Sequence, residues 1–73
     1  MPKLPLLTSR ELVRALRRAG FEFVRQSGSH AIYQREDGRF ANVPIHDNDI
    51  PLGTLRAILK TTGISAENLK DLR

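Results

Sequence analysis

The spacing of apolar residues predicts two amphipathic helices, one in each half of the chain. From Ser9 to Ala19 the apolar residues fall on one helical face and the basic residues on the opposite face. The apolar face holds Leu12, Val13, Leu16 and Ala19, and the basic face holds Arg10, Arg14, Arg17 and Arg18. Thr8 and Glu11 have the spacing of a capping box, and Gly20 suits the left-handed conformation that ends many helices.

The second predicted helix runs from about Pro51 to Thr61. Its apolar stripe consists of Leu52, Leu55, Ile58 and Leu59. Arg56 and Lys60 lie four residues apart on another face. Pro51 suits the first turn, where its missing N–H costs nothing, and Asp49 is placed to assist the same end of the helix.

A short third helix is expected near the C-terminal end. Gly63 is placed to end the second helix in the left-handed conformation. Ser65 can cap the last helix, which carries Leu69 and Leu72.

Between the two main helices the pattern predicts three strands. They are Phe21–Gln26, His30–Arg35 and Arg39–Pro44, and they are joined by Ser27-Gly28-Ser29 and by Glu36-Asp37-Gly38. Consecutive strands with short turns form an antiparallel meander. The order α-β-β-β-α with a terminal helical turn predicts an α+β fold with both main helices on one face of a three-stranded sheet, as a single domain over residues 1–73.

The direction of His30 depends on which side of its strand faces the helices. If Ile32 faces them, a regular strand aims His30 inward as well, and a bulge at Gly28-Ser29 would re-aim it. If Ala31 and Tyr33 face the helices, Ile32 lies on the open face of the sheet. The sequence leaves both arrangements open.

Composition narrows the class of protein. The chain has 73 residues and no cysteine, which excludes disulfides and thiolate metal sites. Twelve Lys and Arg against eight Asp and Glu give a net charge of +4, and nine of the twelve cations are Arg. Such a surface either binds nucleic acid or is simply solvated. The sequence has neither the apolar run of a signal peptide nor that of a membrane span, so we expect a cytoplasmic protein without membrane contact.

The motif Gly28-Ser29-His30 is the strongest candidate for chemistry. An unperturbed imidazole exchanges protons near neutral pH, with a pKa of about 6.5. Glycine lets backbone approach a ligand closely, and N–H groups of such a turn can hold a phosphate oxygen. The alternative is a strand histidine that only makes a hydrogen bond.

Other side chains are candidates for supporting roles. His46 follows the third strand and is either a loop residue or a second proton carrier near His30. Arg25 and Arg35 are expected to flank the Gly-Ser-His turn and to contact phosphates. A metal site from His30, His46, Asp47 and Asp49 is conceivable, but the spacing is not that of a metal motif, and we expect neither metal nor cofactor.

The ordered set of motifs resembles the HicA toxins over nearly the whole chain. The residues that carry the resemblance are Pro2-Lys3-Leu4-Pro5, Ala19-Gly20-Phe21, Arg25, Gly28-Ser29-His30, Tyr33, Val43-Pro44-Ile45-His46, Gly53-Thr54-Leu55, Ile58-Leu59-Lys60 and Gly63-Ile64-Ser65. The resemblance implies a fold similar to a double-stranded-RNA-binding domain, an mRNA interferase activity with His30 as catalytic histidine, and a HicB-type antitoxin that covers this face. It assigns no role to His46.

These expectations define a function and its competitors. The expected function is metal-independent endoribonuclease cleavage of mRNA, with a ribose 2′-OH attacking the adjacent phosphate and DNA therefore spared. Six further residues are expected to bind RNA or to support His30: Gly28, Ser29, Arg25, Arg35, His46 and Lys60. A non-catalytic module that reads duplex RNA with Arg56 and Lys60, or a domain that binds only protein, remains the alternative.

Overall fold

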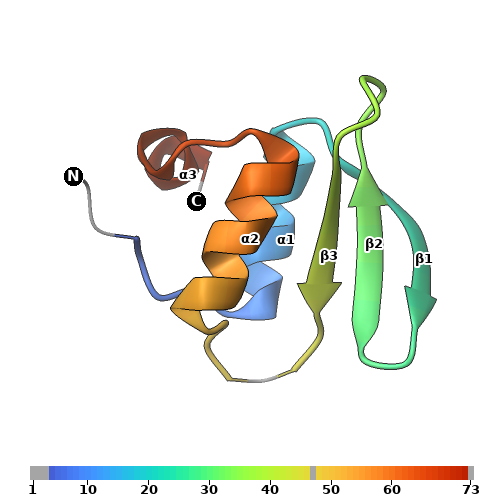
Figure 1. Ribbon diagram of the computed structural model, residues 1–73, viewed down its shortest axis with the longest axis horizontal. Coiled ribbons are helices and arrows are strands. Elements are labelled where there is room, and N and C mark those ends of the chain that lie inside the picture. The colour runs from blue at the N-terminus through green and yellow to red at the C-terminus, as the bar shows by residue number, and fades with distance from the viewer. Residues whose placement is uncertain (1–3, 47, 73) are drawn as a thin grey trace.

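The computed structural model describes residues 4–46 and 48–72. Its elements follow the predicted order. They are α1 (Ser9–Arg18), β1 (Glu22–Ser27), β2 (His30–Gln34), β3 (Phe40–Pro44), α2 (Leu52–Thr62) and α3 (Ala66–Leu72). Each predicted boundary lies within one residue of the observed one, and the α+β fold is confirmed (Figure 1).

The three strands form an antiparallel sheet in the order β1-β2-β3. In β2 and β3, His30 lies opposite Pro44 and Ala31 lies opposite Val43. The register between β1 and β2 shifts between Phe23 and Arg25, which identifies a bulge at Val24. The bulge therefore lies in the middle of β1 and not in the Gly28-Ser29 turn.

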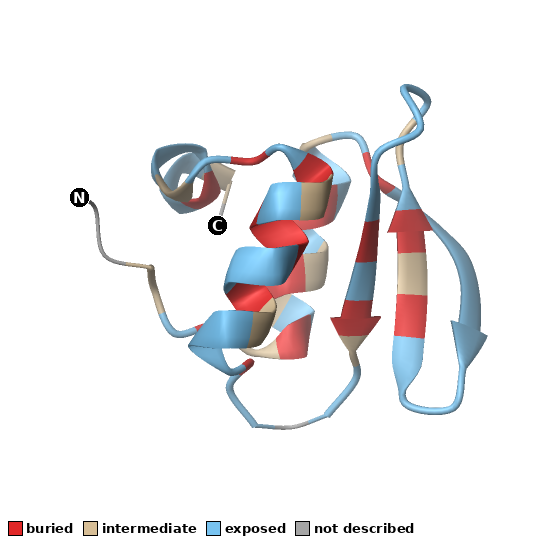
Figure 2. Ribbon diagram, viewed as in Figure 1, coloured by how far each residue is buried: buried red, intermediate tan, exposed pale blue. Residues whose placement is uncertain are grey.

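One face of the sheet is buried and the other is open. Ala31, Tyr33, Ala41 and Val43 are buried, while their neighbours along β2 and β3 are exposed or half-buried (Figure 2). The second of the two arrangements left open by the sequence is thus the correct one. Because side chains alternate along a strand, His30 and Ile32 lie on the open face.

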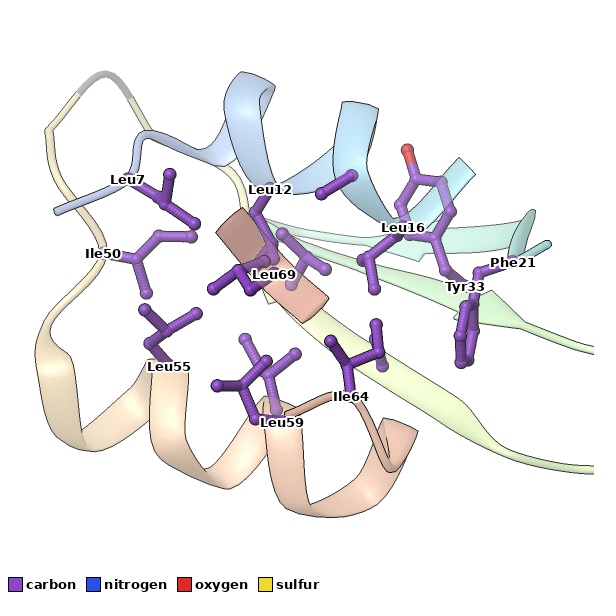
Figure 3. Close-up of a cluster of buried hydrophobic side chains, with 14 of the residues drawn as sticks. Leu7, Leu12, Leu16, Phe21, Tyr33, Ile50, Leu55, Leu59, Ile64 and Leu69 are labelled. Atoms are coloured by element: carbon purple, nitrogen blue, oxygen red, sulfur yellow. The ribbon is translucent and has the colours of Figure 1, made fainter. Parts of the chain in front are cut away.

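The core fills the space between the helices and the buried face of the sheet (Figure 3). Leu12, Ala15 and Leu16 of α1 are fully buried, whereas Val13 is only partly buried. The apolar face of α1 is therefore centred closer to Ala15 than its pattern predicted. Every residue of β1 is exposed, so this edge strand lies outside the cover of the helices (Figure 2).

The helix termini use mostly the predicted residues. Thr8 and Glu11 form the capping box, with the Thr8 N–H donating to Glu11 Oε1 at 3.0 Å and the Glu11 N–H donating to Thr8 Oγ1 at 3.2 Å. Ser65 Oγ accepts from the Asn68 N–H at 3.0 Å at the start of α3. Gly63 ends α2 at a φ of 76°, in the left-handed region.

The start of α2 differs from the prediction. Pro51 is the N-cap, and no side chain caps this end. Asp49 forms an isolated β-bridge with Thr8, because the chain turns back toward the start of α1 at this point. Asp49 is therefore a backbone partner of the N-terminal segment and not a cap of α2.

Among the described residues, no helix has both the length and the apolar character of a membrane-spanning segment.

Candidate active site

The Gly-Ser-His turn joins β1 to β2 and projects His30 into solvent. Gly28 has a φ of 57°, which favours glycine, and nothing lies within 4 Å of a Cβ built on it. The Ser29 carbonyl accepts from the Ile45 N–H at 2.6 Å. This bond ties the turn to the segment that follows β3 and so fixes the backbone just before His30.

His46 is held by a residue that the sequence analysis did not single out. The buried hydroxyl of Ser9 donates to the Pro44 carbonyl and accepts from the His46 N–H at 3.4 Å. Ser9 is the first residue of α1, directly after the N-cap Thr8, so its place in the sequence indicates only the start of a helix. Only its burial and its partners 35 and 37 residues away reveal this role.

His30 and His46 line the same groove. Its volume is about 350 Å³, and its lining comes mostly from the open face of β3 and from α2. The lining residues are His30, Phe40, Asn42, Pro44, His46, Pro51, Thr54, Ala57, Ile58 and Thr61. Two exposed imidazoles on one groove can act as a base and an acid on the same bound group.

Arg35 lies elsewhere than predicted. It follows β2 at the end opposite His30, about 16 Å away along the strand. Its guanidinium contacts Asp37 at 2.7 Å, donates to the Ala19 carbonyl at 3.3 Å, and lies 4.8 Å from the centre of the Phe21 ring. Arg35 therefore stabilises the β2–β3 turn and the end of α1 and does not flank the Gly-Ser-His turn.

The hydrogen bonds from the Arg35 side chain and from the Arg39 backbone lower the pKa of Asp37. The hydrogen bond between Arg35 and Asp37 also raises the pKa of Arg35. The folded state is thus favoured by an ionised Asp37 at pH values above its unfolded pKa. This contribution is lost as the pH falls through the lowered pKa. Because the pair is exposed to solvent, the effect on stability is small.

Arg25 remains close to the candidate site. It lies opposite Ile32 in the β1–β2 pair, on the same open face as His30 and one diagonal step away. Within the described part of the chain Arg25 forms no ion pair. Lys60 is exposed on α2 but is not one of the residues that line the groove.

A metal site is the alternative arrangement for the two histidines. Across residues 4–46 and 48–72, no three His, Cys, Asp or Glu side chains lie close enough together to hold a metal ion. Asp47, one of the four residues considered for such a site, lies outside the described residues.

Comparison with models of known protein families assigns the chain to one family. The family model described as "HicA toxin of bacterial toxin-antitoxin" matches residues 9–64, more than three quarters of the chain. The match includes every residue that lines the groove. No curated protein matches the chain. The chain therefore belongs to the HicA family, and it is the toxin of a bacterial toxin–antitoxin system.

Proposed function

We propose that this toxin is a metal-independent endoribonuclease that cleaves mRNA in the cytosol by histidine acid–base catalysis. The observation that carries the proposal is the placement of His30 and His46 on one groove. Arg25 on the open face and the net charge of +4 of the chain support an anionic substrate. His30 is the principal catalytic residue, and His46 is its partner.

The reaction needs two proton transfers, and the groove offers two imidazoles. One imidazole takes the proton from a ribose 2′-OH as the 2′-oxygen forms a bond to the adjacent phosphorus. The other imidazole gives a proton to the 5′-oxygen as the P–O5′ bond breaks. The products are a 2′,3′-cyclic phosphate and a 5′-hydroxyl. Turn N–H groups and Arg25 stabilise the negative charge that grows on the phosphate.

Cleavage is expected to continue in EDTA, because imidazoles supply both the base and the acid. Purified toxin is incubated with end-labelled single-stranded RNA with and without EDTA, and the product ends are identified. We expect equal rates and a 2′,3′-cyclic phosphate or its hydrolysis product. Loss of cleavage in EDTA that a divalent ion restores would contradict the proposal. Tight binding of duplex RNA without cleavage would favour the non-catalytic alternative.

His46→Ala is expected to slow cleavage less than His30→Ala. The reason is that a solvent water molecule can take over the proton transfer assigned to His46, whereas His30 is the principal catalytic group and is harder to replace. His46 is exposed and only its backbone N–H is held by Ser9, so the variant should remain folded. Single-turnover rates over a range of pH measure the effect. A His46→Ala protein with an unchanged pH–rate profile would remove His46 from the reaction.

The partner of the toxin is proposed to be a HicB-type antitoxin that covers His30. Membership of the family implies an antitoxin partner. His30 and Arg25 lie on the open, uncovered face of the sheet, where a protein with acidic side chains can bind both. Such cover would exclude RNA by occupying its site.

A further inference from the structure

The groove extends beyond the two histidines. His30 is paired with Pro44, and Asn42 and Phe40 follow on the same face of β3 at two-residue steps. Each step moves about 7 Å along the strand. Neither Asn42 nor Phe40 takes part in the proposed proton transfers, although both line the groove. This part of the groove therefore has no role in the chemistry described so far.

Phe40 presents an aromatic surface to solvent. Its exposed fraction is 45%, and the only ring pair among the described residues is that of Phe23 with Tyr33. An aromatic side chain exposed at the end of a groove offers a flat surface for a second aromatic ring. Nucleobases that are not paired stack on such side chains in proteins that bind single strands.

Asn42 adds hydrogen-bonding capacity between Phe40 and the histidines. It is exposed, and its amide makes no hydrogen bond to any other described residue. The amide has both a donor and an acceptor, so it can contact the edge of a base. The half-buried Thr54 of α2 brings a hydroxyl to the same groove.

We propose that the Phe40 end of the groove binds one unpaired nucleobase next to the phosphate that is cut. Phe40 stacks on the base, and Asn42 reads its edge. The groove, of about 350 Å³, lies at the small end of ligand sites and has room for a base. Stacking on Phe40 and a contact to the base edge both need a base that is neither stacked in a helix nor paired. The substrate is thus single-stranded RNA with a preference at one nucleotide beside the cut, despite the likeness of the fold to a duplex-binding domain. This inference rests on the proposed function.

The test compares three variants on one substrate. A single-stranded RNA of mixed sequence, and the same RNA annealed to its complement, are incubated with wild type, Phe40→Ala and Asn42→Ala. Cut positions are mapped by sequencing, and kcat/KM is measured. Phe23→Ala is the matched control, because Phe23 is a similarly exposed phenylalanine (51%) on the opposite face of the sheet.

Phe40→Ala should lower kcat/KM on the single strand about tenfold, the size expected for one lost stacking contact, while Phe40→Trp retains it. Asn42→Ala should flatten the base preference beside the cut and leave the product ends unchanged. The duplex should be cut at least about tenfold more slowly than the single strand. Phe23→Ala should match wild type. Equal cutting of duplex and single strand, or an unchanged base preference in Asn42→Ala, overturns the inference.

Binding by the His30→Ala protein separates this inference from the proposed function. Its affinity for the single-stranded RNA is measured by fluorescence anisotropy, with and without Phe40→Ala. Affinity that depends on Phe40, together with a wild type that does not cleave, supports the base site and contradicts the endoribonuclease. Cleavage by wild type with an affinity that is independent of Phe40 supports the endoribonuclease and contradicts the base site.

Discussion

His30→Ala is expected to slow RNA cleavage by about 10²–10⁴-fold, the usual contribution of a positioned acid or base, and to abolish growth inhibition. The imidazole is exposed at the start of β2 and contributes no core packing, so the variant should keep its fold. Cleavage is measured on labelled RNA in single turnover, and folding by circular dichroism and thermal unfolding.

The control for His30→Ala is a variant that changes exposed polar surface without touching the groove. Asn68→Ala serves, because Asn68 is exposed on α3, which packs against α1, and is not a lining residue of the groove. We expect Asn68→Ala to cleave at the wild-type rate. A well-folded His30→Ala protein that also cleaves at that rate would end the enzymatic proposal.

The second large effect concerns the antitoxin. We expect a tight complex with a HicB-type protein that buries Gly28, Ser29 and His30 and stops cleavage. Arg25→Glu should slow association about tenfold at low salt and make it less salt-dependent, because Arg25 is an exposed cation on the face that the partner covers. Stopped-flow association at several salt concentrations measures both quantities.

Arg17→Glu is the matched control for the charge reversal. It makes the same change in net charge, but Arg17 lies beside Phe21 and Glu22, at the end of β1 away from the Gly-Ser-His turn. Its effect on association should be clearly smaller than that of Arg25→Glu. Arg35→Glu is unsuitable, because Arg35 holds Asp37 and the Ala19 carbonyl. RNA cleavage that continues inside the complex would contradict the proposed mode of inhibition.

The elements of this fold could be predicted because their signals are local. The capping box at Thr8 and Glu11 and the glycine at position 63 act within a few residues, and the observed helices begin and end beside them. The three strands follow from short apolar runs with turns between them. Local signals of this kind are present in the sequence before any tertiary contact forms.

What could not be predicted depends on contacts between distant segments. The outward direction of His30 follows from the burial of Ala31 and Tyr33, and the sequence pattern allowed either face. Its nearness in sequence predicts Arg35 beside the Gly-Ser-His turn, but a strand of five residues carries it to the opposite end of the sheet. Catalysis by His30 and the supporting roles of Gly28, Ser29, Arg25, His46 and Lys60 stay predictions.

The bond between Ser9 and the segment after β3 bears on when the toxin becomes harmful during its synthesis. A nascent chain that has emerged only as far as His30 carries the Gly-Ser-His motif, but Pro44, His46 and all of α2 are still to come. Ser9 then has no partner to hold, and neither wall of the groove has been made, because β3 and α2 both follow His30. The nascent chain therefore lacks the proposed active site until α2 has been synthesised, late in translation.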